Sequence, residues 1–119
     1  MTILIAEDEP LMRKTLSMKL EKEGYMVISC ADGKEALQKL EEETPDMVIT
    51  DIMLPYASGL EIISFVKNKN SSMPVIVLSA LGLEKTVENA FDLGADDYVT
   101  KPFNLNELVI RVKRLLKKK

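Results

Sequence analysis

The feature that most constrains the fold is a regular alternation of short apolar runs with amphipathic stretches. The runs have the length and β-branched content of buried strands. They are TILIA at 2–6, YMVISC at 25–30, DMVIT at 46–50, PVIVLS at 74–79 and DYVT at 97–100. Five strands that alternate with five helices predict an α/β fold, in which helices cover both faces of a parallel sheet through right-handed crossovers.

Local signals indicate where the helices begin and end. Pro10 suits the first turn of a helix that Gly24 ends. Asp32 and Asn104, each followed three residues later by a glutamate, predict N-caps. The apolar residues expected on the buried helix faces are Leu11, Met12, Leu16 and Leu20; Ala36, Leu37 and Leu40; Leu60, Ile62, Ile63 and Val66; Val87, Ala90 and Phe91; and Leu108, Val109, Val112 and Leu115. The run at 74–79 is the most apolar, so we expect that strand to be central and covered on both faces.

Composition limits the available chemistry. The chain of 119 residues fits one domain, 1–119. No apolar run approaches the roughly 20 residues of a membrane span, and MTILIAEDEP turns acidic too early for a signal peptide. The single cysteine, Cys30, excludes an internal disulfide, agrees with a cytoplasmic location and is expected to be a buried apolar side chain. Histidine is absent, so chemistry must rely on carboxylates, hydroxyls and lysine.

The net charge of −3 is unevenly distributed. The segment IAEDEP is acidic, whereas RVKRLLKKK at the end of the chain carries six basic residues among nine. We expect this basic segment to be a solvated helix end, where cations complement the helix dipole. Contact with nucleic acid is the alternative.

Polar residues stand where the apolar runs end. They are Glu7, Asp8 and Glu9 after the first run, Asp51 after the third, Ser79 at the end of the fourth, and Thr100 and Lys101 at the end of the fifth. Because parallel strands place their carboxyl ends at one edge of a sheet, these side chains should converge there. Crowded carboxylates repel one another unless a cation intervenes, and an all-oxygen donor set favours Mg²⁺. We therefore expect Asp51 at the mouth of the sheet rather than inside it.

Four segments, ILIAEDEP, DIMLPYASG, VLSA and DYVTKPF, resemble in order and spacing the receiver domain of two-component response regulators. The resemblance covers essentially the whole chain. It implies a flavodoxin-like, doubly wound sheet with strand order 2-1-3-4-5. It also implies a signalling switch, rather than a turnover enzyme, that is phosphorylated by a cognate sensor histidine kinase.

The same resemblance implies roles for individual residues. Asp51 corresponds to the phosphoacceptor, Asp8 to a direct Mg²⁺ ligand and Glu7 to a ligand acting through water. The backbone carbonyl of Met53 would be a further ligand. The remaining roles fall to Ser79, which would hydrogen-bond the phosphoryl group; Lys101, which would pair with it; Pro102, which would follow a cis peptide bond; and Tyr98, the aromatic residue that would move inward on activation.

Two positions depart from what rapid hydrolysis of the phosphoryl group would need. Met53 and Leu81 stand two residues after the phosphoacceptor and two after the hydroxyl, where the resemblance places the path of the attacking water. Both side chains are apolar and cannot orient water. We therefore expect slow self-dephosphorylation.

The segment DYVTKPFNLNELVIRVKRLL resembles the subfamily in which a winged-helix DNA-binding domain follows the receiver. The resemblance implies a phosphorylation-dependent homodimer through the fourth helix, fifth strand and last helix. Intersubunit charge pairs would involve Asp96, Asp97, Glu107, Arg111 and Lys113. The fourth helix departs from the pattern, because past Lys85 it has no basic residue to meet Glu107. The end at Lys119 suggests a receiver excised from a longer regulator; a stand-alone receiver stays open, and no DNA binding is expected of residues 1–119.

Simpler interpretations exist for each residue. Asp51 could be a turn carboxylate, Ser79 an ordinary strand-end hydroxyl and Lys101 a surface lysine. Tyr98 could be half-buried packing, and Glu9 is best explained as a surface acid near the first helix. Two other classes of protein also place charge after a strand. A dehalogenase-type phosphohydrolase would need a second aspartate at the position of Met53, and a flavin- or nucleotide-binding module would need a phosphate loop where AEDEPLM is acidic.

Overall fold

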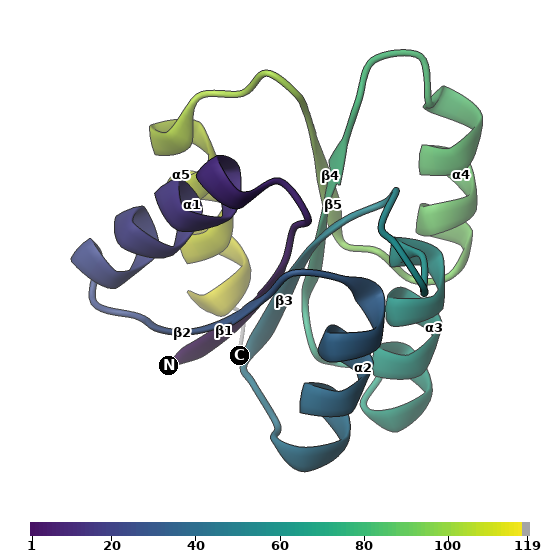
Figure 1. The fold of residues 1–119 in the computed structure, drawn as a ribbon, viewed down its shortest axis with the longest axis horizontal. Helices are drawn as coiled ribbons and strands as arrows, with labels where there is room; N and C mark the ends of the chain where they lie inside the picture. The colour runs from purple at the N-terminus through teal and green to yellow at the C-terminus, as the bar shows by residue number, and fades with distance from the viewer. Residues whose placement is uncertain (118–119) are drawn as a thin grey trace.

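The computed structural model describes residues 1–117, in which five parallel strands alternate with five helices (Figure 1). The strands are β1 (Thr2–Ala6), β2 (Met26–Cys30), β3 (Met47–Asp51), β4 (Val75–Ser79) and β5 (Asp97–Thr100). The helices are α1 (Pro10–Lys22), α2 (Gly33–Glu42), α3 (Gly59–Lys69), α4 (Glu84–Asp92) and α5 (Leu105–Lys117). The predicted elements are thus confirmed, with boundaries that differ by one or two residues.

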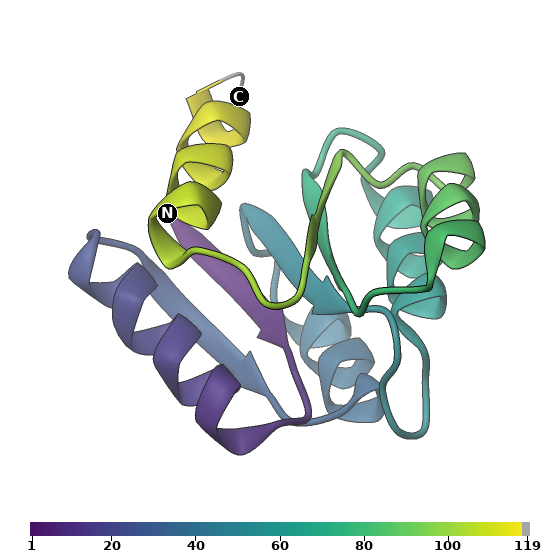
Figure 2. The same cartoon turned by 90° about the horizontal axis from the view of Figure 1, so that it is seen from above.

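The strands form one sheet in the order β2-β1-β3-β4-β5, with every neighbouring pair parallel, as predicted. Helices α1 and α5 cover one face, and α2, α3 and α4 cover the other (Figures 1 and 2). A buried apolar core lies on each face of the sheet, and successive strand residues point into one core and then the other. In β1, Ile3 and Ile5 pack with α1 and α5, whereas Leu4 and Ala6 pack on the opposite face. β4 is buried at all five positions, as expected, but the middle place in the sheet belongs to β3.

The helix starts follow the predicted caps. The Asp32 carboxylate accepts a hydrogen bond from the Glu35 N–H at 2.8 Å, and the Asn104 side chain accepts from the N–H groups of Asn106 and Glu107. Glu9, expected to be a plain surface acid, caps α1 by accepting from the N–H groups of Leu11 and Met12.

Two apolar residues lie outside the helix faces predicted for them. Leu11 is 71% exposed, because it stands five residues before Leu16 and so about 140° around the helix from it. Met12, Leu16 and Leu20, spaced by four, make the face that packs against the sheet. Phe91 is 42% exposed, although Ala90 beside it is buried.

Three further expectations concern the cysteine, membrane-spanning segments and the basic end of the chain. Cys30 is buried, as predicted, and burial raises the pKa of its thiol to about 12. Within residues 1–117, no helix combines the length and apolar character needed to cross a membrane. The predicted basic helix end includes Lys118 and Lys119, which lie outside the described residues.

Candidate functional site

Four charged side chains from three separate parts of the chain meet at the carboxyl edge of the sheet. Glu7 and Asp8 follow β1, Asp51 is the last residue of β3, and Lys101 follows β5. The Lys101 Nζ lies 2.6 Å from Glu7 Oε1 and 2.6 Å from Asp51 Oδ2. Carboxylate oxygens of Glu7, Asp8 and Asp51 all lie within 4.8 Å of one another. The site therefore joins residues up to 94 positions apart.

The charges of this cluster are not balanced and favour the binding of a cation. Burial raises the pKa of Glu7, against hydrogen bonds from Lys101 and the Glu9 N–H. Burial opposes the Lys101 charge, but hydrogen bonds with Asp51 and Glu7 outweigh it and raise the pKa of Lys101. Three carboxylates against one ammonium leave a formal charge of −2, which one divalent cation would neutralise. Carboxylate oxygens are also the ligands that Mg²⁺ prefers, so the residues fit a magnesium ion.

Asp51 is more enclosed than the sequence suggested. It is only 7% exposed, because it is the last residue of the buried strand β3 rather than part of the following loop. Its Oδ1 accepts a long hydrogen bond of 3.4 Å from the Met53 N–H, while Oδ2 is held by Lys101. A carboxylate this buried needs a counter-charge, and Lys101 supplies it.

Two glycines, whose role the sequence analysis missed, hold the loop after β3 in place. A Cβ atom at Gly33, the first residue of α2, would overlap the Ala57 backbone, and one at Gly59, the first of α3, would overlap the Asp51 carbonyl. The Gly59 N–H also donates to the Ile52 carbonyl at 2.8 Å. The available signal was a glycine directly after each N-cap, Asp32 and Ser58.

Ser79 and Tyr98 lie near the acidic cluster but do not join it. The Ser79 hydroxyl donates to the Ala80 carbonyl at 3.0 Å rather than to Asp51. Tyr98 is 41% exposed, and its ring meets Phe91 edge-on, with centroids 5.7 Å apart and planes at 88°. A cavity of about 330 Å³ lies between them, lined by the β4–α4 loop, Tyr98 and Thr100. Ser79 thus lies at the edge of the sheet that the sequence predicted, but its hydroxyl is not hydrogen-bonded to Asp51.

Two backbone features stand out in the segment between β5 and α5. The peptide bond between Lys101 and Pro102 is cis, in agreement with the sequence-based expectation. The Lys101 N–H donates to the Ser79 carbonyl at 2.7 Å, which ties the loop after β5 to the end of β4.

The five charges predicted on the dimer face all have partners within the chain. Lys67 binds Asp96 at 2.9 Å, and Arg111 donates to both Asp97 oxygens at 2.9 Å. The other pairs are Arg114 with Asp97, Arg111 with Glu107, and Lys113 with Glu23. An intersubunit role for these side chains would require partners to be shared or exchanged.

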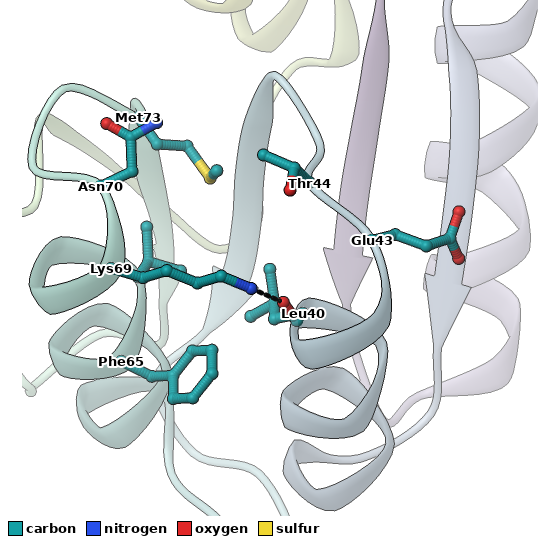
Figure 3. A pocket seen from close by; sticks show the side chains of 8 residues that line it. Leu40, Glu43, Thr44, Phe65, Lys69, Asn70 and Met73 are labelled. Carbon is teal, nitrogen blue, oxygen red and sulfur yellow. Dashed lines mark hydrogen bonds between the residues drawn. The ribbon is translucent and has the colours of Figure 1, made fainter.

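A separate cavity of about 240 Å³ lies between the C-terminal ends of α2 and α3 (Figure 3). Its lining includes Leu40, Phe65 and Met73, and Lys69 closes one side by donating to the Leu40 carbonyl at 2.6 Å. These helix ends lead into the starts of β3 and β4. The cavity is therefore at the opposite edge of the sheet from Asp51.

A family model described as the response regulator receiver domain matches residues 3–113. The chain belongs to this family. Response regulator RR06 of Streptococcus pneumoniae is 45% identical over 99% of the chain and 54% of the relative. PhoP of Bacillus subtilis, a transcriptional regulatory protein for alkaline phosphatase synthesis, is 40% identical over 98% of the chain and 48% of the relative.

Solved structures agree with the assignment to receiver domains. The receiver domain of the Francisella response regulator 1452 is 35% identical, with a TM-score of 0.90 over 98% of this receiver and 97% of that chain. A CheY-like receiver from Methanospirillum hungatei is 29% identical, with a TM-score of 0.94 over 98% and 94%. The receiver spans about half the length of the curated relatives named above. The match sets aside the phosphohydrolase and flavodoxin-type alternatives.

Proposed function

We propose that this receiver accepts a phosphoryl group on Asp51 from a phosphohistidine of a cognate sensor kinase, and acts as a switch rather than a turnover enzyme. The observation that carries the proposal is the meeting of Asp51 with Glu7, Asp8 and Lys101 at the carboxyl edge of the sheet. The 119 residues contain no histidine, so the donor imidazole must lie outside them.

The proposed transfer replaces one bond to phosphorus with another. An Asp51 carboxylate oxygen attacks, the P–N bond of the phosphohistidine breaks, and the leaving imidazole takes up a proton. Such a transfer depends mainly on positioning and on neutralising negative charge. Lys101, at 2.6 Å from Asp51, is placed to move from the carboxylate to a phosphoryl oxygen.

Magnesium is the cofactor that we propose for this transfer. Asp8, Asp51 and the Met53 backbone carbonyl would hold it directly, and Glu7 would act through water. Bound magnesium would neutralise charge on the phosphoryl oxygens. Asp8 is exposed, whereas Glu7 is buried and held by Lys101, which agrees with the direct and indirect roles.

The switch would involve Ser79 and Tyr98. Phosphorylation would draw the Ser79 hydroxyl away from the Ala80 carbonyl and toward the phosphoryl group, and the Tyr98 ring would then turn into the neighbouring cavity. The size of that cavity and the exposed position of the ring support this movement. The change would alter the surface formed by α4, β5 and α5.

We propose that the altered surface forms a homodimer. Ile110 and Leu93 leave exposed apolar area on it, while the five charges predicted to pair between subunits already have partners within the chain. PhoP of Bacillus subtilis is named as a transcriptional regulatory protein, which supports an output on transcription through a C-terminal winged-helix domain that binds DNA. A cytoplasmic location agrees with the free thiol of Cys30.

The proposed phosphoform is long-lived. The Met53 and Leu81 side chains are 63% and 77% exposed, and at the positions where the resemblance places the path of the attacking water they offer no group that orients it. Met53→Asn, which adds an amide, should speed loss of the phosphoryl group. A wild-type phosphoform that decays within seconds would contradict this proposal.

Incubation with a small phosphodonor, with and without Mg²⁺, tests the function. We expect a mass gain of one phosphoryl group that requires Mg²⁺ and is lost in Asp51→Asn and Asp8→Asn. Asp92→Asn on α4, which removes an exposed carboxylate remote from the site, serves as the matched control. Unchanged labelling of Asp51→Asn would overturn the assignment, and size-exclusion chromatography of both forms tests the dimer.

A further inference from the structure

Arg13, in the first turns of α1, reaches back to the loop that carries the acidic residues. Its Nη1 donates to the Glu7 carbonyl at 3.0 Å and makes a longer contact of 3.5 Å with the Asp8 carbonyl. The side chain is half-buried. Because both contacts are to backbone oxygens, they could not be predicted from the pairing of oppositely charged side chains in the sequence.

The two carbonyls belong to the peptide units on either side of the Asp8 Cα atom. Fixing both units restricts the backbone torsions of Asp8 and so the direction in which its side chain leaves the chain. Among residues 1–117, the Asp8 carboxylate itself has no hydrogen-bond or ion-pair partner. Glu7 differs, because Lys101 and the Glu9 N–H hold its carboxylate.

We propose that Arg13 is a positioning residue for the metal site: by holding the peptide units around Asp8, it keeps that carboxylate aimed at the magnesium position between Glu7 and Asp51. This inference rests on the proposed function, because it concerns the same magnesium site. A guanidinium suits the task, since it stays charged and offers several N–H donors in a rigid plane.

The charge of Arg13 and its positioning role predict opposite changes in Mg²⁺ affinity when the side chain is removed. The Arg13 guanidinium is a positive charge near the cation site, so removing it should strengthen Mg²⁺ binding if charge were its only influence. If positioning dominates, removal should weaken binding. The sign of the change therefore distinguishes the two.

The experiment is a MgCl₂ titration of the unphosphorylated protein, followed by the NMR amide shifts of Asp8 and Asp51. We expect Arg13→Met to weaken Mg²⁺ binding roughly tenfold, the lower end of the effect of losing a group that orients a metal ligand. Arg13→Gln, which keeps N–H donors without the charge, should recover part of the affinity. Lys14→Met removes a neighbouring exposed charge of α1 and should leave binding unchanged or slightly stronger.

A second measurement separates positioning from a general loss of structure. With a small phosphodonor, Arg13→Met should label slowly at low Mg²⁺ and approach the wild-type rate at saturating Mg²⁺. Thermal unfolding without Mg²⁺ checks that the variant is folded; if it is not, Arg13→Gln decides the comparison.

The possible failures are distinct. If wild type binds Mg²⁺ and Arg13→Met binds it equally well or more tightly, the positioning role of Arg13 is wrong while the proposed function stands. If wild type neither binds Mg²⁺ nor takes up a phosphoryl group, the proposed function itself fails.

Discussion

Two regions at the same edge of the sheet differ in how complete they are. The acid–lysine side, made of Glu7, Asp8, Asp51 and Lys101, is already assembled, with two ion pairs of 2.6 Å. The hydroxyl–tyrosine side, made of Ser79 and Tyr98, is not: Ser79 bonds to a neighbouring carbonyl and Tyr98 rests against Phe91. Charge attraction therefore preorganises the acid–lysine side, whereas under the proposed function the hydroxyl–tyrosine side would gain its missing partner from the phosphoryl group.

The substitution expected to reduce phosphorylation most lies on the acid–lysine side. Lys101→Gln removes the only cation within 4 Å of Asp51 among the described residues. We expect phosphorylation by a small phosphodonor to fall about a hundredfold, the usual effect of losing a preorganised charge at a transition state. Mg²⁺ binding should not weaken, because a competing positive charge has gone. Phosphorylation within twofold of wild type would show that the lysine contributes no such charge.

A smaller effect is expected for Ser79→Ala on the hydroxyl–tyrosine side. The unphosphorylated protein should keep its stability, since within residues 1–117 the hydroxyl bonds only to the adjacent carbonyl of Ala80. Phosphorylation by the small phosphodonor should slow about tenfold, the effect of losing one hydrogen bond to a charged group. The NMR signals of the Tyr98 ring should no longer shift on phosphorylation. Melting curves, labelling rates and NMR of the ring test these points. A large loss of stability before phosphorylation would mean that this side is already assembled.

A still smaller change is expected when the Phe91 ring is removed. Phe91→Ala abolishes the edge-on contact with Tyr98, which is worth about 1 kcal/mol. Tyr98 should then turn inward more often without phosphorylation, while the labelling rate stays within twofold of wild type. Ring NMR measures the first and mass spectrometry the second. Ile110→Ala, an exposed apolar truncation on α5, is the control and should leave the ring signals unchanged.

The smallest effect lies away from both sides, at the Lys113–Glu23 pair of 2.8 Å. The hydrogen bond that Lys113 donates to Glu23 lowers the pKa of the Glu23 carboxyl below its ordinary 4.5 and raises the pKa of Lys113 above its ordinary 10.5. The pair should therefore stabilise the fold between these pH values and cease to do so as the pH falls through the lowered pKa of Glu23. Lys113→Ala should reduce the melting temperature slightly at pH 7 and not at pH 2. An equal reduction at both pH values would assign the effect to packing.

The elements and the meeting of the strand ends could be predicted because each follows from a local pattern. Apolar runs set the strands, Asp32 and Asn104 set helix starts, and parallel pairing brings Asp51 and Lys101 to one edge. Other details depend on tertiary geometry that residue type does not encode. The exposure of Leu11, the choice of the Ala80 carbonyl by Ser79, and the reach of Arg13 to backbone oxygens belong to this class.

The two glycines against the loop after β3 have a consequence for recombining receivers. Gly33 and Gly59 allow the first turns of α2 and α3 to approach the loop so closely that a methyl group would collide with its main chain. The loop and the two helix starts thus fit together as a single module. A chimaera that takes the loop from one homologue and, from another, a helix start with a residue larger than glycine at position 33 or 59 should have a displaced loop after β3, even if every charged side chain is retained.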